Sequence, residues 1–326
     1  MMWATLEPFH NRLARLALVI LCLLAVHGCD GGGAAKTVDF SRTVQVDRPS
    51  EDQRGGRKLR MAVAAMISPK DTFDLYRQLL TYISRRMDVE LEFVQRKTYA
   101  EISELLRQGL VDVAFVCSGP YATGKQKYGL ELLATPEIRG SHFYQAYLIV
   151  GKDSPCKELR DLKGKTFAFT DPDSNTGRLV PLHWLATLGE RPDSFFSKTI
   201  YTYSHDNSIL AVSRGLVDGA AVDGLIWEFY ARRNPEFTAQ TRVILKSEPF
   251  GIPPVVVSEH LDRGSKERIQ EVLFHMHEDA EGKKILGDLS IDRFIAPSDE
   301  WYASIRNLER TMLSATQDKG HGGAKP

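Results

Sequence analysis

Residues 166–177 read TFAFTDPDSNTG, and residues 199–223 read TIYTYSHDNSILAVSRGLVDGAAVD. Each stretch begins with apolar and β-branched side chains that favour a strand, and then passes through polar residues into a segment with helical periodicity. Strands that alternate with helices in this way predict an α/β fold with mostly parallel sheets. The elements expected here are strands at 199–205 and 217–223 and helices at 206–215 and 224–233.

The same alternation extends outward along the chain from about Lys58. Asp71 is expected to cap one helix, and Thr98 and Glu101 form a Thr-x-x-Glu capping box at the start of the next. The other expected strands lie at 59–66, 89–95, 111–117, 144–151, within 161–171 and at 255–257. The other expected helices lie at 71–87, 98–108, just past 118–120, within 174–189, and at about 265–280 and 299–314.

One local sequence pattern occurs twice in the chain. Residues 107–116 read RQGLVDVAFV and residues 213–222 read SRGLVDGAAV, so a helix, a glycine, Leu-Val-Asp and an apolar strand follow one another in both places. A repeated unit of this kind indicates two similar lobes.

Composition excludes several classes of protein. The chain has 326 residues, 42 Lys+Arg, 42 Asp+Glu and 43% hydrophobic residues, which is enough apolar material for a sizeable core and excludes disorder as the main state. A nucleic-acid binder is not expected because a net charge of zero supplies no basic surface. The 4 cysteines include no Cys-x-x-Cys pair and so form no zinc or haem motif, while a disulfide between Cys117 and Cys156 stays open.

The N-terminus has the features of an export signal. Arg12 and Arg15 precede an uncharged run at 16–28, which is too short to cross a bilayer as a helix. The run ends in Val-His-Gly-Cys, which resembles a lipobox, so residues 1–28 are predicted to be a lipoprotein signal peptide and Cys29 the lipid anchor in the periplasm or on the cell surface. His27 departs from the usual lipobox, which leaves ordinary cleavage or an uncleaved anchor as alternatives. Polar, Gly-rich residues 29–57 predict a flexible tether, and residues 315–326 a disordered tail.

Four junctions between a strand and a helix are suited to an anion. Helix N-termini point unpaired N–H groups past the carboxyl ends of strands, where α/β proteins bind ligands. The junctions lie at 66–69, at 117–120 with Ser118, at 171–177 and at 204–206, and each is a strand end rich in Ser, Thr, Gly or Pro. The third is the most informative, because Ser174, Asn175 and Thr176 offer donors in a row and Gly177 permits close approach of the backbone. A plain N-cap loop is the alternative, since helix starts favour the same residues.

Three runs together resemble the PhnD-like phosphate, phosphite and phosphonate binding proteins, which are the substrate-binding components of ABC transporters. The runs are TYAEISELLRQGLVDVAFVCSGPY at 98–121, FAFTDPDSNTGRLVPLHWL at 167–185 and YTYSHDNSILAVSRGLVDGAAVD at 201–223. The resemblance covers about residues 59–310 and implies a two-lobed type II periplasmic binding protein fold with a hinge between the lobes. It implies lobe 1 at 58–145 and 249–314, the latter including the C-terminal helices, and lobe 2 at 146–248.

The resemblance also implies the ligand contacts. The family's Ser-Thr-Ser-Gly loop falls on Ser174, Asn175, Thr176 and Gly177, so Asn175 and Thr176 are departures that keep donor capacity. The family's pocket histidine falls on His205, and its two pocket tyrosines fall on Tyr99 and Tyr144, for which packing in the core or at the pocket rim is the alternative. If His205 contacts the ligand as a cation, affinity weakens as pH rises through its titration.

Two features bear on the ligand's chemistry. Leu225 and Pro253 stand at the positions where relatives that take an ammonium-bearing phosphonate have carboxylates, so an inorganic oxyanion or a small alkylphosphonate is expected. Asp206 offers a carboxylate that would favour an anion with P–OH and repel sulfate, unless it caps a helix and faces away.

We therefore expect a lipid-anchored binding protein, with no cofactor or metal, that delivers a phosphorus oxyanion to an ABC permease. A protein that reports the ligand to a membrane histidine kinase is the alternative. A hydrolase is the third class, but the chain has no Gly-x-Ser-x-Gly, His-Glu-x-x-His or Walker A motif. HMHED at 275–279 resembles a metal site, for which a solvated helix face is the favoured interpretation.

Overall fold

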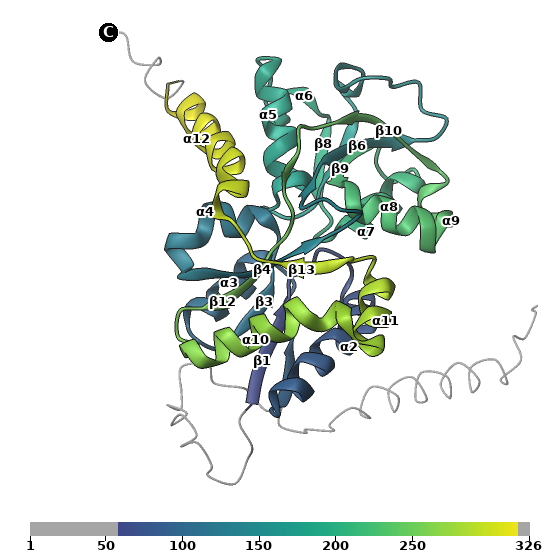
Figure 1. Cartoon of the computed structure of the whole chain (residues 1–326). Helices are drawn as coiled ribbons and strands as arrows, with labels where there is room; N and C mark the ends of the chain where they lie inside the picture. Colours follow the sequence, from purple (N-terminus) through teal and green to yellow (C-terminus); the bar gives the residue numbers. More distant parts are fainter. Residues whose placement is uncertain (1–57, 319–326) are drawn as a thin grey trace, which may run out of the picture. The chain divides into compact units, whose positions relative to one another are not determined.

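The computed structural model describes residues 58–318, which belong to one compact unit. The predicted signal peptide, Cys29, the tether and residues 319–326 lie outside the described residues. Figure 1 shows two layered groups of strands and helices, which we call lobe 1 and lobe 2.

Lobe 1 is built on a six-stranded sheet of order β13-β4-β12-β3-β1-β2. Its strands are β1 (Lys58–Val63), β2 (Glu90–Val94), β3 (Val113–Phe115), β4 (Leu130–Glu137), β12 (Val255–Ser258) and β13 (Arg293–Ile295). Its helices are α2 (Pro69–Met87), α3 (Tyr99–Arg107), α4 (Ser118–Tyr128), α10 (Arg263–His275), η3 (Met276–Glu278), α11 (Ala280–Leu289), η4 (Asp299–Tyr302) and α12 (Ala303–Asp318). Two apolar clusters form its core, one centred on Met61 and Leu79 and the other on Ala62 and Tyr302.

Lobe 2 is built on a five-stranded sheet of order β10-β6-β9-β7-β8. Its strands are β6 (Ala146–Gly151), β7 (Thr166–Phe169), β8 (Lys198–Tyr201), β9 (Gly219–Asp223) and β10 (Thr241–Lys246). Its helices are η1 (Leu159–Leu162), η2 (Asn175–Leu179), α5 (Val180–Thr187), α6 (Pro192–Phe195), α7 (His205–Ser213), α8 (Gly224–Arg233) and α9 (Pro235–Thr238).

The chain crosses between the lobes twice, and the two crossings pair with each other. β5 (Phe143–Tyr144) runs antiparallel to β11 (Phe250–Gly251), with Phe250 opposite Tyr144. The crossing strands therefore lie side by side between the two sheets, where a small rotation of the backbone would move one lobe against the other.

The expectation of mostly parallel sheets is wrong, because both sheets are mixed. β1 pairs in parallel with β2 and β3, but β12 is antiparallel to both of its neighbours. In lobe 2, β7 pairs in parallel with β8 and β9, whereas β6 is antiparallel to β9 and β10. β6 and β12 each follow a crossing, and a strand that enters a sheet from the other lobe runs in the opposite sense to the βαβ strands.

Helix ends follow local capping chemistry. The Thr98–Glu101 capping box is confirmed at the start of α3. Asp71 is not the cap of α2, because Ser68 accepts the Asp71 N–H and Pro69 takes the first helical position. The helix predicted at about 265–280 is α10 followed by the short 3-10 turn η3, and α11, which starts where Asp279 accepts the Gly282 N–H at 2.7 Å, was not predicted. The last helix extends to Asp318, four residues into the predicted disordered tail.

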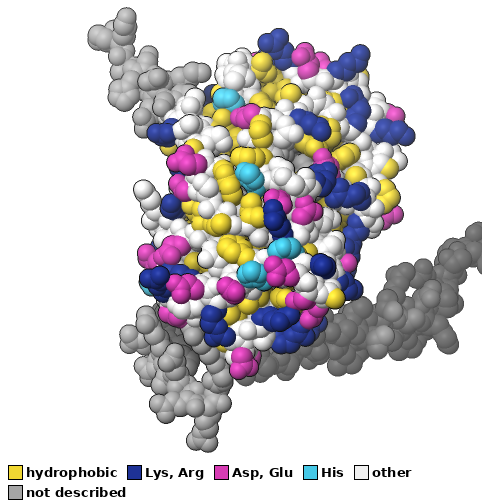
Figure 2. Space-filling model, viewed as in Figure 1, with side chains coloured by type: hydrophobic (Ala, Val, Ile, Leu, Met, Phe, Trp, Pro, Cys, Tyr) yellow, Lys and Arg dark blue, Asp and Glu magenta, His cyan; other side chains and the backbone are white. Residues whose placement is uncertain are grey.

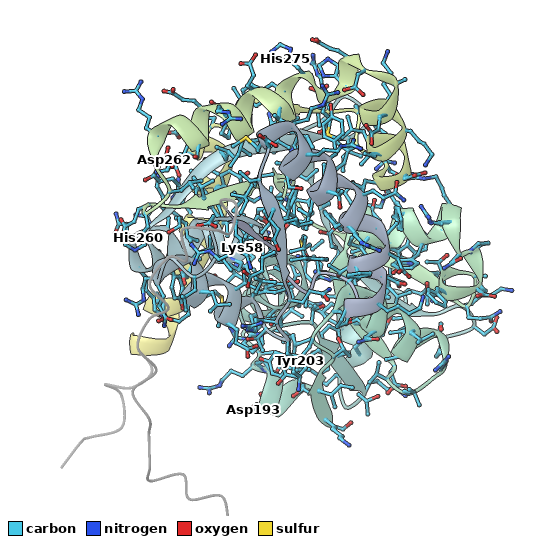
Figure 3. The ribbon with its side chains drawn as sticks, turned by 90° about the horizontal axis from the view of Figure 1, so that it is seen from below. Lys58, Asp193, Tyr203, His260, Asp262 and His275 are labelled. Carbon is cyan, nitrogen blue, oxygen red and sulfur yellow. The ribbon has the colours of Figure 1, made fainter. Side chains whose placement is uncertain are left out.

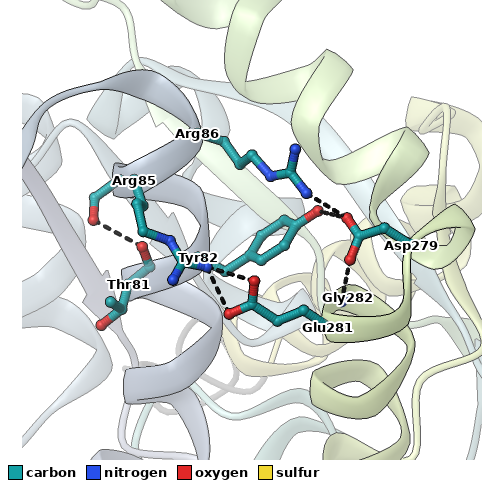
Figure 4. Close-up of polar contacts among 8 residues, drawn as sticks. Thr81, Tyr82, Arg85, Arg86, Asp279, Glu281 and Gly282 are labelled. Carbon is teal, nitrogen blue, oxygen red and sulfur yellow. Dashed lines mark hydrogen bonds and ion pairs between the residues drawn. The ribbon is translucent and has the colours of Figure 1, made fainter.

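A polar cluster joins α2 to α11 within lobe 1. We call Tyr82, Arg85, Arg86, Asp279 and Glu281 the α2–α11 clamp (Figure 4). Arg86 donates to Asp279 at 2.7 Å, Arg85 donates to Glu281 at 2.6 Å, and the Tyr82 hydroxyl donates to Asp279. Each side chain of the clamp therefore forms a hydrogen bond with another member of the clamp.

The surface carries both charges in a mixed pattern. Figure 2 shows Lys and Arg interspersed with Asp and Glu over the visible face of both lobes, in keeping with the zero net charge. Within residues 58–318, no helix is both long and apolar enough to cross a membrane.

Candidate functional site

The loop after β7 begins the site on lobe 2. Ser174 accepts the Gly177 N–H at 3.0 Å, and residues Asn175–Leu179 make a π-helical turn that leads into α5. Gly177 has no room for a side chain, since a Cβ there would lie 2.4 Å from the Thr170 side chain. Glycine at 177 therefore permits close packing against Thr170 within lobe 2.

Several helix starts meet at the boundary between the lobes. Tyr99 begins α3, Ser118 begins α4, Asn175 begins η2 and His205 begins α7, and all four side chains are buried. The unpaired N–H groups at such starts give the enclosed space a positive potential without any Lys or Arg.

Hydrogen bonds connect these starts across the boundary. The Asn175 amide donates to the Tyr144 hydroxyl at 3.2 Å, and that hydroxyl also bonds to the Ser118 hydroxyl. The Tyr99 N–H donates to Asp171 at 3.2 Å. These contacts place Tyr144 and both loops around one space, although the residues lie far apart along the chain.

The two lobes approach each other very closely beside this space. A Cβ on Gly119 in α4 would lie 2.3 Å from the Asp173 carbonyl oxygen of lobe 2. On another side of the boundary, the Tyr230 hydroxyl of α8 donates to Asp71 of α2 at 2.6 Å. The lobes are thus in a closed arrangement.

Six buried polar atoms around the boundary have no hydrogen-bond partner among the described residues. They are Tyr99 Oη, Asn175 Oδ1, Thr176 Oγ1, Ser204 Oγ, His205 Nε2 and Asp206 Oδ1, and we call this set the interlobe site. A buried polar group left without a partner costs about 1–3 kcal/mol. Six such groups in one region indicate a place prepared for a polar molecule.

His205 is a neutral donor in this site. Its Nδ1 accepts the Asp223 N–H at 3.0 Å, so the ring hydrogen of the neutral imidazole is on Nε2. Burial lowers the pKa of His205 to about 3 because the charged ring would lose its hydration. The ring therefore does not carry the cationic charge that the sequence left open for it.

Asp206 faces lobe 1 and does not cap α7. Ser204 is the cap residue of that helix, while Asp206 Oδ2 accepts the Ser68 N–H across the boundary at 3.1 Å. The neighbouring His205 N–H donates to the Met66 carbonyl at 2.9 Å. Asp206 Oδ1 thus remains an unused acceptor at the closed boundary.

Two residues that sequence reasoning missed support the site. Thr170 lies 3.1 Å from His205 Nδ1 and fills the space beside Gly177. Asp223 caps α8 by accepting the Leu225 and Ile226 N–H groups, and burial raises the pKa of its carboxyl to about 7. An aspartate followed by glycine at the end of an apolar strand was the available signal for Asp223.

Two further predictions concern a disulfide between Cys117 and Cys156 and a metal site at 275–279. Cys117 and Cys156 are both free and buried. Figure 3 shows His275, the first residue of the 275–279 run, at the opposite end of the view from Tyr203. His275 bonds to Glu278 at 3.1 Å on an exposed surface, and residues 58–318 contain no group of three or more His, Cys, Asp or Glu arranged to hold a metal.

Comparisons with known proteins give consistent results. Residues 61–302 match the family model described as the periplasmic substrate-binding protein of phosphonate ABC transporters. The phosphonates-binding periplasmic protein of Escherichia coli K12 is 26% identical over 279 residues, covering 83% of this chain and 82% of that protein. The phosphate-import protein PhnD of Mycolicibacterium smegmatis is 28% identical over 219 residues, covering 62% of this chain and 67% of that protein.

Solved structures agree with the fold. A binding protein component of an ABC phosphonate transporter from Pseudomonas aeruginosa superposes with a TM-score of 0.77 at 26% identity, covering 83% of this chain and 91% of that one. PhnD1 from Prochlorococcus marinus, solved in complex with methylphosphonate, superposes with a TM-score of 0.72 at 20% identity, covering 79% and 98%.

Proposed function

The chain belongs to the family of periplasmic substrate-binding proteins of phosphonate ABC transporters, and from this premise we propose that its ligand is a phosphorus oxyanion that still carries an acidic hydrogen. Members of this family bind solutes for transport by a membrane permease and are not enzymes. Which ligand this chain takes depends on the groups that face the interlobe site.

The unpaired atoms of the interlobe site carry the proposal, because they include both donors and acceptors. Tyr99, Thr176, Ser204 and His205 present hydroxyl or imidazole hydrogens, which suit the oxygens of an anion. Asn175 Oδ1 and Asp206 Oδ1 can only accept, so the ligand must also donate a hydrogen. A phosphate, phosphite or phosphonate monoanion has a P–OH group, whereas sulfate at neutral pH has none.

The other predicted contacts take supporting roles in this proposal. The Tyr144 hydroxyl accepts a hydrogen from the Asn175 amide, and Ser118 bonds to that same hydroxyl. Ser174 uses its hydroxyl to accept the Gly177 N–H, so it shapes the loop that presents Thr176. The proposed contacts therefore come from both lobes, and closure of the lobes would complete the set.

Opening is proposed to occur at the paired crossings. Residues 58–145 and 249–314 would move as lobe 1, and residues 146–248 as lobe 2, with rotation near β5 and β11. The hydrogen bonds at Asp206 and Asp171 span the two lobes and would break on opening.

Asp206→Asn tests the chemistry of the site. The amide group can donate a hydrogen where the carboxylate can only accept one, so we expect the preference for methylphosphonate over sulfate to fall by at least about tenfold. Calorimetry on the full chain with phosphate, phosphite, hypophosphite, methylphosphonate, 2-aminoethylphosphonate and sulfate measures this preference. If wild-type protein binds sulfate as tightly as the phosphorus acids, the proposal fails.

Anchoring through Cys29 is a separate proposal that rests on the lipobox-like sequence at 26–29. Cys29→Ser should release the protein from the membrane fraction, as judged by fractionation and immunoblotting against wild type. Continued membrane retention of the Cys29→Ser protein would instead support an uncleaved anchor. The histidine-kinase alternative stays a prediction that no observation here tests.

A further inference from the structure

An open hollow of about 540 Å³ lies on the boundary between the lobes. Lobe 1 contributes Gln95, Arg96 and Lys97 to its lining, and lobe 2 contributes Thr202, Tyr203 and Ser204. Ser204 also belongs to the interlobe site, where its hydroxyl is buried and unpaired among the described residues. The hollow therefore extends from the surface to the edge of the interlobe site.

The charged side chains of the hollow are all cationic. Among the described residues that line it, only Arg96 and Lys97 are charged, and both are exposed. Arg96 donates to the Gln95 carbonyl at 2.7 Å, and neither cation forms a salt bridge within residues 58–318. The nearest carboxylates along the chain, Glu101 and Asp206, do not line the hollow and accept backbone N–H groups at 2.9 and 3.1 Å. Two unpaired cations at this place attract anions toward the interlobe site.

Lys97 also contacts the opposite lobe. Its Nζ lies 4.5 Å from the centre of the Tyr203 ring, which is a cation–π contact. Tyr203, labelled in Figure 3, has a φ of 61°, a left-handed backbone conformation that is uncommon for tyrosine. Its N–H donates to the Thr170 carbonyl at 2.7 Å, which fixes the backbone beside the ring. The contact joins the two lobes, so it forms only when they are closed.

We infer that this hollow is the entrance through which the anion reaches the interlobe site, and that Lys97 both attracts the anion and covers the entrance after closure. The inference rests on the proposed function, because it requires an anionic ligand at the interlobe site. The two actions of Lys97 affect different rates. Its charge increases the association rate, and its contact with Tyr203 decreases the dissociation rate.

Stopped-flow mixing of the full chain with methylphosphonate or phosphate measures both rates. In low salt, Lys97→Gln should lower the association rate about two- to fivefold, because it removes one attractive charge. It should raise the dissociation rate about two- to fivefold, because it removes the cation–π contact. In about 1 M NaCl the screening length is about 3 Å, so the difference in association rate should disappear. Lys97→Arg keeps the charge and the contact and should restore both rates.

Tyr203→Asn separates the charge of Lys97 from its contact with the ring. Asparagine tolerates the left-handed backbone but has no ring, so the dissociation rate should rise as in Lys97→Gln while the association rate stays at the wild-type value. Lys198→Gln is the matched control for the lost charge. Lys198 is an exposed residue at the start of β8 and does not line the hollow, so this variant should keep both rates.

The outcomes separate the two proposals. If wild type binds these anions but Lys97→Gln associates at the wild-type rate in low salt, the inference is overturned and the proposed function stands. A loss that persists in about 1 M NaCl, or an equal loss in Lys198→Gln, also overturns it. So does an unchanged dissociation rate in Lys97→Gln and Tyr203→Asn. If methylphosphonate, phosphate and phosphite all fail to bind wild type, the proposed function fails and the inference fails with it.

Discussion

Polar side chains are paired in the α2–α11 clamp and unpaired in the interlobe site. In the clamp, Asp279 alone accepts from Tyr82, Arg86 and the Gly282 N–H. In the interlobe site, Thr176 Oγ1 and His205 Nε2 are fully buried and bond to nothing among the described residues. Both regions join segments far apart in sequence, but only the interlobe site has unpaired buried atoms, for which the proposed ligand would supply partners.

From this difference we expect the clamp to contribute to the stability of the fold and the interlobe site to contribute to ligand affinity. The clamp is largely exposed to water, which screens its charges, so its pairs hold two helices together with modest energy. The interlobe site is buried, where an unpaired group is costly and a paired one is strong. Substitutions in the clamp should therefore change the stability of the fold, and substitutions in the interlobe site should change affinity.

Thr176→Val should give the largest effect, and it tests whether a substitution in the interlobe site changes affinity without changing stability. Valine has nearly the shape of threonine but cannot donate, and a hydrogen bond to a charged ligand corresponds to about 10- to 100-fold in affinity. We expect calorimetry with methylphosphonate to show that loss, while chemical denaturation shows no loss of stability, because the deleted hydroxyl has no partner among residues 58–318.

The same substitution at Thr241 is the matched control. Thr241 Oγ1 accepts the Trp227 indole N–H at 3.0 Å and donates to the Thr238 carbonyl at 2.9 Å, far along the chain from the interlobe site. Thr241→Val should reduce the free energy of unfolding by about 1–3 kcal/mol and keep the affinity. A large loss of stability in Thr176→Val with unchanged affinity would contradict the comparison.

Asp279→Ala should lower the melting temperature at pH 7 by a few degrees with no change in affinity, because it removes the cap of α11 and three hydrogen bonds. The Gly282 N–H, Tyr82 and Arg86 lower the pKa of Asp279 below its usual value of 3.8. The stabilisation is therefore present above about pH 3.8 and is lost as pH falls below it. Thermal denaturation at pH 7 and at pH 3 measures this, and an equal difference from wild type at both values would contradict it.

Asp223 should give the smallest effect, which appears only as a dependence on pH. Its raised pKa of about 7 means that the carboxyl gains negative charge between pH 6 and pH 8, close to the proposed anion. We expect the affinity of wild type, relative to Asp223→Asn, to fall about three- to tenfold over this range. The ratio cancels the ligand's own titration, and asparagine keeps the helix cap.

The raised pKa of Asp223 also makes the stability of the fold depend on pH. Because the folded pKa lies above the usual value of 3.8, the stabilisation from protonated Asp223 is complete below about pH 3.8 and is lost as pH rises through about 7. A constant affinity ratio from pH 6 to pH 8 would show that the charge of Asp223 does not reach the ligand.

Local signals predicted much of the fold. The helix at 224–233 and the capping box at Thr98 depend on neighbouring residues, and the structure has both. Strand β13 is only three residues long and β10 reads TRVILK, so neither carries a strong pattern, and both depend on pairing with distant strands. The mixed direction of the sheets depends on the two crossings, which no local pattern records.

The site was predictable only in part for the same reason. Ser174–Gly177 and His205 were found through a resemblance over three motifs, whereas Thr170 and Asp223 resemble an ordinary strand end and an ordinary cap. Their positions beside His205 arise from contacts between separate strands.

Gly119 gives the closed arrangement a kinetic consequence. A Cβ at this position would lie 2.3 Å from the Asp173 carbonyl oxygen, far inside van der Waals contact. With any other residue at 119, the lobes could not close fully. The hydrogen bonds from Ser68 to Asp206 and from Tyr99 to Asp171 would then not form. Full closure of the lobes therefore requires glycine at 119, and we expect a larger residue there to speed the release of a bound solute.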